Sequence, residues 1–180
     1  MITRIASLIA IAIFSTFVFS CATSPDRSNL SAVATQATPR NNITPADIAK
    51  LKWIEGTWRG MDGDTPFYER YRIEESAMVV EGLKDGDSSA VESTDRFELV
   101  NGEFGKTEGD KRSVASEIGD GFIQFVPAVA AKGNNFRFVR QPDGTWQAIL
   151  EWPATGDKPA RTKVYKMERW PLNAPANSNK

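Results

Sequence analysis

The sequence predicts an all-β protein, an up-and-down antiparallel β-barrel of eight to ten strands with a short N-terminal helix. From Trp58 onward, Gly, Asp and Asn interrupt the chain at short intervals, and the segments between them alternate or carry β-branched and aromatic residues. The connections are mostly hairpin-sized, and the clearest turns are Asn101-Gly102, Gly119-Asp120-Gly121 and Pro142-Asp143-Gly144. Closing such a meander into a barrel leaves no exposed strand edge.

The barrel domain is expected to begin with a helix of little more than two turns. Thr44 can cap this helix, Pro45 suits its first position, and Asp47 complements the positive helix end. Gly56 ends the helix, and a strand begins there. The expected strands cover residues 56–60, 65–74, 77–83, 90–100, 103–108, 112–118, 122–126, 135–140, 145–152 and 162–170.

The first residues predict an export signal. Arg4 supplies a positive start, and the apolar run from Ile5 to Phe19 is too short to span a bilayer comfortably. The run ends at Val18-Phe19-Ser20-Cys21-Ala22, which resembles the lipobox of bacterial lipoproteins. The resemblance implies a signal peptide over residues 1–20 and acylation of Cys21 with fatty chains such as palmitate. The alternative is cleavage after Ala22, which would leave a soluble periplasmic protein.

An acylated Cys21 would anchor the protein to a membrane of the cell envelope. In the sorting pattern of such lipoproteins, Ala22 after the cysteine, rather than an acidic residue, implies the outer membrane. Each buried acyl methylene contributes about 0.8 kcal/mol, so two or more chains give a stable anchor. Because Cys21 is the only cysteine, no intramolecular disulfide is expected.

Composition divides the rest of the chain into one domain and two polar segments. Residues 21–43 are rich in Ser, Thr, Ala, Pro and Asn and have no apolar period, and residues 171–180 share this character. Such segments bury too little surface to offset the entropy of ordering. We therefore expect a flexible tether, a barrel domain over residues 44–170, which is the size of one ordinary domain, and a disordered tail.

Charge and residue content exclude several functions. The 22 Lys and Arg against 23 Asp and Glu give a net charge of −1, which creates no field to attract nucleic acid. The absence of His removes the commonest general base and the commonest transition-metal ligand. No nucleophile motif, phosphate-binding loop or metal-spaced cluster occurs. We expect no nucleic-acid partner, no cofactor, no metal and no enzyme.

The helix that runs into Gly56-Thr57-Trp58 resembles the start of the barrel in lipocalins and their calycin relatives. In these proteins a Gly-x-Trp motif on the first strand closes one barrel end, and the Trp pairs with a basic side chain from the last strand. The resemblance assigns Arg169 to Trp58, with Lys166 as the second candidate. The segment from Leu51 to Trp58 and the closing Met-x-Arg also resemble small lipocalin-like domains of bacterial secreted proteins and lipoproteins.

Alternation along the strands predicts an interior lined by aromatic rings and two carboxylates. The predicted lining residues are Phe67, Glu69, Tyr71, Asp95, Phe97, Phe138 and Trp146. A barrel of this size is either filled by side chains or holds one small ligand, and aromatic residues suit both cases. Glu69 and Asp95 are costly to bury without a partner, water or a ligand, unless they lie at a wet rim.

Three functions are compatible with this pattern. The favoured one is binding of a small apolar or amphipathic molecule, with an apolar body and a hydroxyl or cationic group, inside an envelope-anchored barrel. The second is a filled barrel that serves as a scaffold and docks another envelope protein. The third is an enzyme with Glu69 and Asp95 as an acid–base pair, for which two carboxylates on separate strands are a weak signal.

Overall fold

The computed structural model describes residues 42–86, 90–106, 112–129 and 133–171. The expected signal peptide, the acylated Cys21 and almost all of the expected tether and tail lie outside these ranges. The described chain contains one short helical segment and ten strands. The strands are β1 (Gly56–Asp62), β2 (Thr65–Ile73), β3 (Ala77–Leu83), β4 (Val91–Val100), β5 (Glu103–Gly105), β6 (Ser113–Gly119), β7 (Phe122–Pro127), β8 (Asn135–Arg140), β9 (Trp146–Trp152) and β10 (Arg161–Arg169).

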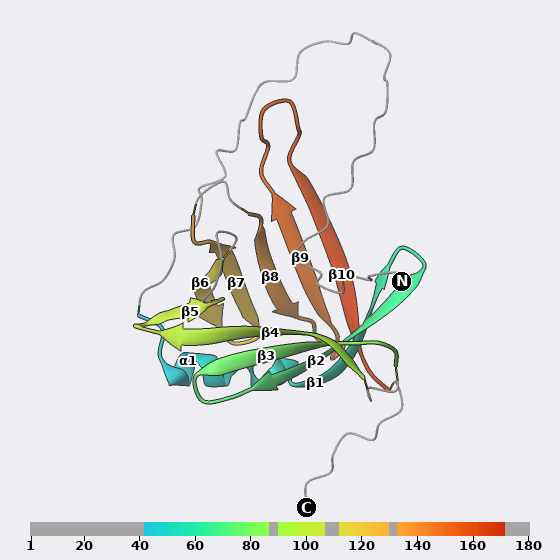
Figure 1. Ribbon diagram of the computed structural model, residues 1–180, viewed down its shortest axis with the longest axis horizontal. Helices are drawn as coiled ribbons and strands as arrows, with labels where there is room; N and C mark the ends of the chain where they lie inside the picture. The colour runs from blue at the N-terminus through green and yellow to red at the C-terminus, as the bar shows by residue number, and fades with distance from the viewer. Residues whose placement is uncertain (1–41, 87–89, 107–111, 130–132, 172–180) are drawn as a thin grey trace, which may run out of the picture. The chain divides into compact units, whose positions relative to one another are not determined.

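The ten strands form a closed antiparallel barrel in which each strand pairs with its neighbours in sequence, and β1 pairs with β10 (Figure 1). This is the predicted fold class, with the largest of the expected strand numbers. Most strand ends lie within one residue of their predicted positions. The differences are β1, which continues to Asp62, and β5, which ends at Gly105 just before the undescribed residues 107–111.

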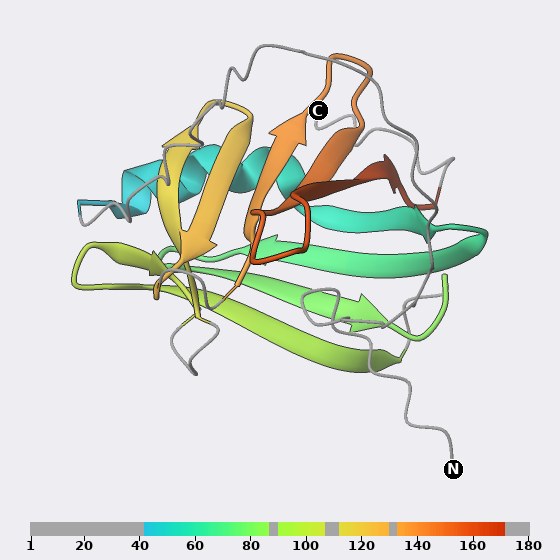
Figure 2. The ribbon, with the colours of Figure 1, turned by 90° about the horizontal axis from the view of Figure 1, so that it is seen from above.

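Two groups of strands face each other across the interior. Strands β2 to β4, drawn in green, lie on one side, and β6 to β10, drawn in yellow to red, lie on the other (Figure 2). The two groups run in steeply crossing directions in Figure 1, as the right-handed twist of a closed sheet requires. The side chains that both groups turn inward form the core.

The strand register determines which side chains share the interior face, because directly paired residues point to the same side of a sheet. Tyr71 pairs with Val80, and Val80 pairs with Asp95. On the opposite side of the barrel, Phe138 pairs with Ala148, and Ala148 pairs with Tyr165. Tyr71 and Phe138 meet edge to face with ring centroids 6.1 Å apart, so both series point into the barrel.

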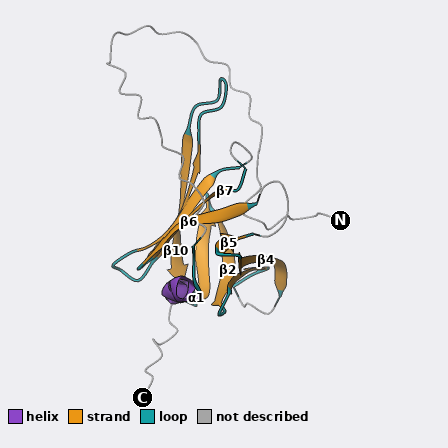
Figure 3. Cartoon of the chain, turned by 90° about the vertical axis from the view of Figure 1, so that its left-hand side faces the viewer, coloured by secondary structure: helices purple, strands orange, loops and turns teal. Residues whose placement is uncertain are grey.

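A helical segment covers one end of the barrel. It consists of α1 (Pro45–Ala49) and the 3-10 helix η1 (Lys50–Ile54). Its apolar residues Ile48, Leu51 and Ile54 are almost completely buried. Figure 3 shows α1 end-on at this end of the strands. No helix among the described residues is long and apolar enough to cross a membrane.

The capping residues form the predicted helix start. The Thr44 Oγ1 atom accepts a hydrogen bond from the Asp47 N–H at 3.3 Å, and the Asp47 carboxylate accepts one from the Thr44 N–H at 3.0 Å. This reciprocal pair is a capping box. Ile43, which composition assigns to the tether, is buried and donates its N–H to the Gly102 carbonyl oxygen at 2.9 Å. The buried part of the chain therefore includes Ile43, one residue before the expected start of the barrel domain.

The two barrel ends carry different connections. At the helix end the turns are tight, with residues 101–102 between β4 and β5 and residues 120–121 between β6 and β7. The opposite end carries the two-residue turn between β1 and β2 and also longer connections, such as residues 153–160 between β9 and β10. The β9–β10 hairpin projects beyond the other strands at that end (Figure 1). The interior is thus covered at the helix end, and we refer to the opposite end as the distal end.

Candidate functional site: the barrel interior

The helix end of the interior is closed by Trp58 and Arg169. Trp58 is 2% exposed and donates its indole N–H to the Ile54 carbonyl oxygen at 2.6 Å. The Arg169 guanidinium lies over the indole, with its Cζ atom 4.1 Å from the ring centroid, and it donates to the Glu55 carbonyl oxygen. The contact expected from the resemblance is present. Lys166, the second candidate, instead places its Nζ atom 3.6 Å from the Glu168 carboxylate.

Gly56 leaves the space that the Arg169 guanidinium occupies. Its φ angle is +114°, and a Cβ atom at this position would lie 2.0 Å from the Arg169 Nη1 atom. Both the backbone conformation and the close approach therefore require glycine. The Gly-x-Trp pattern thus has a structural role in joining the first strand to the last.

Above this closure, the helix-end half of the interior is filled by aromatic rings. Trp146 is completely buried, and its ring lies 5.9 Å from that of Trp58, 5.4 Å from that of Tyr71 and 5.0 Å from that of Phe138. Phe97 packs beside this group, 4.9 Å from the Phe125 ring. Four of the predicted lining residues, Tyr71, Phe97, Phe138 and Trp146, therefore belong to a packed core in this half.

The interior becomes more exposed toward the distal end. Along β9, the inward-facing Trp146, Ala148 and Leu150 are 0%, 8% and 9% exposed, whereas Phe136 on β8, which pairs with Leu150, is 3% exposed. Further along, Phe67 and Glu69 are half-buried, and the Asp95 side chain retains 29% exposure. Because these residues occupy the inward face of their strands, their exposure indicates that solvent enters from the distal end.

The polar residues of the interior form one cluster, which we call the interior polar site and define as Glu69, Tyr71, Asp95 and Lys106. The Tyr71 hydroxyl donates a hydrogen bond to the Glu69 Oε2 atom at 2.6 Å. The Lys106 Nζ atom donates to the Asp95 Oδ1 atom at 2.7 Å and lies 5.6 Å from the centroid of the Phe97 ring. The two carboxylates predicted on separate strands thus meet in one region.

Lys106 is the one member of this site that is not among the lining residues predicted from the sequence. It follows β5 directly, two residues after Phe104, which is completely buried. Alternation from Phe104 would have turned Lys106 inward, toward the carboxylate expected from the neighbouring strand. Lys106 thus supplies the cationic partner that the partly buried Asp95 carboxylate requires.

The surroundings of Glu69 alter its acidity. Desolvation raises the pKa of Glu69 from 4.5 to about 7; the hydrogen bond from Tyr71 opposes this shift, and the negative charge of Asp95 adds to it. Although Glu69 keeps some solvent contact, the surrounding barrel removes most of its hydration, and this desolvation is the largest cause of the raised pKa. Burial and the charge of Glu69 also raise the pKa of Tyr71 well above its ordinary value. Near pH 7, the protonated and the ionised forms of Glu69 are therefore both populated. The Tyr71 hydroxyl keeps its proton and remains a hydrogen-bond donor.

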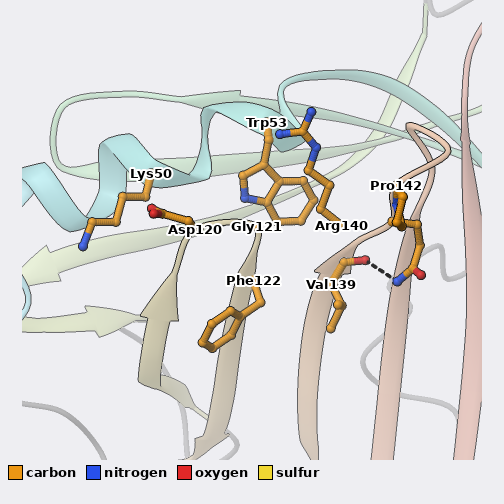
Figure 4. A pocket seen from close by; sticks show the side chains of 9 residues that line it. Lys50, Trp53, Asp120, Gly121, Phe122, Val139, Arg140 and Pro142 are labelled. Carbon is orange, nitrogen blue, oxygen red and sulfur yellow. Dashed lines mark hydrogen bonds between the residues drawn. The ribbon is translucent and has the colours of Figure 1, made fainter.

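A second concavity lies outside the barrel at the helix end. This outer groove, of about 580 Å³, is formed by η1 and by the turns that follow β6 and β8. Figure 4 shows Trp53 in the middle of the groove, with Lys50 and Asp120 on one side and Arg140 on the other. Its lining residues are Lys50, Trp53, Asp120, Gly121, Phe122, Val139, Arg140, Gln141 and Pro142.

Trp53 connects the outer groove to the core. Its ring meets Trp146 edge to face at 6.3 Å, and its buried indole N–H has no hydrogen-bond partner among the described residues. The groove is not evident from the sequence, because Lys50 and Arg140 lie far apart in the chain and charges near turns are usually solvated. In the described ranges, no group of three or more His, Cys, Asp or Glu side chains is arranged to hold a metal ion.

No family model matches the chain, and comparison with curated proteins gives no match. The class of protein is therefore defined by its own geometry. It is a closed ten-stranded antiparallel barrel, covered by a short helical segment at one end, with a polar cluster on its inward face.

Proposed function

We propose that this protein is a lipocalin-like lipoprotein of the cell envelope whose barrel binds one small apolar or amphipathic molecule. The observation that supports this most strongly is the position of Glu69 and Asp95, which face inward among aromatic rings and yet remain partly exposed. A completely filled core would exclude solvent from these groups, and an unpaired buried charge is strongly disfavoured. An interior that is open at the distal end accounts for both the inward orientation and the partial exposure of the two carboxylates.

The distal half of the interior offers surfaces for both parts of an amphipathic molecule. Phe67 and Tyr165 meet edge to face at 5.3 Å, and Leu150 lies on the same inward face. These side chains would contact an apolar body, because burying apolar surface drives association. The polar group would reach Glu69, whose carboxyl group needs a partner to offset its desolvation.

The envelope location rests on the N-terminal sequence. Cys21 directly follows the apolar run, and the polar residues after it would allow the barrel to lie at a distance from the membrane. The contact between Arg169 and Trp58, with Gly56 beneath it, supports the lipocalin-like assignment.

Two neighbouring residues of β9 provide a test with a matched control. Ala148 faces inward and Gln147 faces outward, so Ala148→Trp would fill the interior, while Gln147→Trp adds the same ring outside. The probe is N-phenyl-1-naphthylamine, an uncharged dye that fluoresces in apolar surroundings. Saturable binding by the wild type and Gln147→Trp, weakened about tenfold or more in Ala148→Trp, is expected. Equal binding by all three chains, or none by the wild type, would contradict the proposal.

The outer groove favours a second candidate, a scaffold that docks another envelope protein. Trp53, Phe122 and Pro142 offer apolar surface there, and Lys50 and Arg140 add positive charge. Aromatic and arginine side chains are common in protein interfaces. In this case Arg140→Glu would abolish cross-linking to the partner in intact envelopes and leave binding of the dye unchanged. Loss of dye binding in Arg140→Glu would argue against two separate sites.

A further inference from the structure

The interior polar site contains two carboxylates and one ammonium group. Lys106 is committed to Asp95, with 2.7 Å between the Nζ and Oδ1 atoms. Within the described ranges, Glu69 has the Tyr71 hydroxyl as its hydrogen-bond partner and no cationic partner. The site therefore lacks one positive charge when both carboxylates are ionised.

The elements around Glu69 do not supply this charge. Its strand neighbours are Trp58 on β1 and Gly82 on β3, which carry none. The titratable groups that act on it are Tyr71 on its own strand and Asp95 on β4, to which Lys106 is bound. Further toward the distal end, Tyr165 and Lys163 on β10 share the inward face, and the Lys163 ammonium group lies 4.7 Å from the centroid of the Tyr165 ring and is paired with Asp62 at 2.6 Å. Arg169 lies at the closed end, where it contacts Trp58 and the Glu55 carbonyl oxygen.

Lys106 indicates what kind of group fits beside a carboxylate in this interior. Its ammonium group lies between the Asp95 carboxylate and the Phe97 ring, 5.6 Å from the ring centroid. Aromatic faces attract cations, and a charge-assisted hydrogen bond to a carboxylate is stronger than a neutral one. Glu69 is close to a comparable surface, because its neighbour Tyr71 belongs to the aromatic core.

We propose that the ligand of the barrel is an amphipathic amine, with an apolar body in the distal half of the interior and an ammonium group bound to Glu69. This inference rests on the proposed function and makes it more specific. A carboxylate ligand would meet Glu69 and Asp95 with the same sign of charge. A neutral alcohol would form a hydrogen bond with Glu69 but would not supply the positive charge that the site lacks.

Binding of such an amine depends on pH in a defined direction. The pKa of Glu69 is about 7, so its ionised fraction rises from about 0.1 at pH 6 to about 0.9 at pH 8. An aliphatic ammonium group remains charged over this range, because its pKa is about 10. Because the amine binds the ionised form, its affinity rises about tenfold from pH 6 to pH 8, and binding near pH 7 releases on average about half a proton per chain.

Three compounds with the same ten-carbon chain test the inference by isothermal titration calorimetry on the full chain. They are decylamine, decanol and decanoate, which present a cation, a neutral group and an anion. Decylamine is expected to bind at least about tenfold more tightly than decanol at pH 8, and decanoate more weakly than decanol. Glu69→Gln, which keeps an acceptor for Tyr71, is expected to remove the preference for the amine and its pH dependence. Glu117→Gln, on the exposed side of β6, is the matched control and is expected to behave as the wild type.

The outcomes separate this inference from the proposed function. Binding of decanol that equals or exceeds that of decylamine would overturn the amine assignment and leave interior binding intact. A preference for decylamine that persists in Glu69→Gln would also overturn it, because the charge of Glu69 would then be irrelevant. Binding of none of the three compounds would overturn both proposals. Thermal melting of each variant verifies that the comparison is made on folded protein.

Discussion

Arg169, near the end of the last strand, stacks its guanidinium on the indole of Trp58 in the first strand, 4.1 Å from Cζ to the ring centroid. The two residues are also directly paired in the β1–β10 ladder. Gly56 permits this contact, because any side chain there would collide with the guanidinium. This contact therefore joins residues from the two ends of the domain where β1 and β10 close the barrel.

Replacing Gly56 with Ala is expected to lower the free energy of unfolding by about 2 kcal/mol or more. The new Cβ atom would lie 2.0 Å from Arg169 Nη1, and the φ angle of +114° is strained for any side chain. Gly144→Ala is the control, because Gly144 also has a strongly positive φ, +82°, but has no atom within 4 Å of the added Cβ. Urea denaturation measures both. Equal costs for the two substitutions would mean that the contact with Arg169 imposes no constraint.

Glu69 is expected to make the protein less stable as pH rises toward neutrality. Its pKa rises from 4.5 to about 7 on folding, so the folded state binds this proton more tightly than the unfolded state. Stability from this group is therefore complete below about pH 4.5 and decreases by about 3 kcal/mol as pH increases through 7. Glu69→Gln is expected to remove this part of the pH dependence, measured as the free energy of unfolding at pH 5 and pH 7.5. An identical pH dependence in the variant would contradict the shifted pKa.

The sequence alone predicts the barrel, because strands and turns are indicated by patterns of residues that are close together in the chain. Turn residues mark each strand end, and period-two alternation marks each face, so the strands and the inward positions followed directly. The partnership of Arg169 with Trp58 came from a family resemblance, and the register of β1 with β10 explains it physically.

Depth along the barrel is what the sequence did not provide. Glu69 and Tyr71 lie two residues apart on the same face, yet Tyr71 is packed in the core and Glu69 remains in contact with solvent. Alternation shows which face of the sheet a residue occupies but not its position along the barrel axis. It therefore cannot distinguish an aromatic side chain of the packed core from one that could contact a ligand. The outer groove was missed for a similar reason, because Lys50 and Arg140 are far apart in the sequence and line the same groove only in the folded chain.

The helix that covers the barrel end depends on its capping box. Thr44→Ala removes the hydroxyl that accepts the Asp47 N–H, and it is expected to cost about 1 kcal/mol in the free energy of unfolding. Thr44→Ser, which retains the hydroxyl, is expected to cost much less. Chemical denaturation compares the two, and a Thr44→Ser variant as unstable as Thr44→Ala would show that the cap contributes little.

Cys21 is expected to hold the protein at the membrane. Cys21→Ser removes the thiol that would be acylated, so the protein should move from the membrane to the soluble fraction of lysed cells. Ser20→Ala, which leaves a small residue before the cysteine, should remain with the membrane. Membrane retention of Cys21→Ser would contradict the lipoprotein assignment and leave the interior site unaffected.

Native mass spectrometry of the protein purified from its own envelope tests the binding of a molecule inside the barrel most directly. The predicted spectrum contains a complex of one chain with one small molecule, and this extra mass is absent from Ala148→Trp and retained in Gln147→Trp, since only Ala148 faces inward. A spectrum with bare protein alone, or with the same bound mass in both variants, would contradict the account of an open interior.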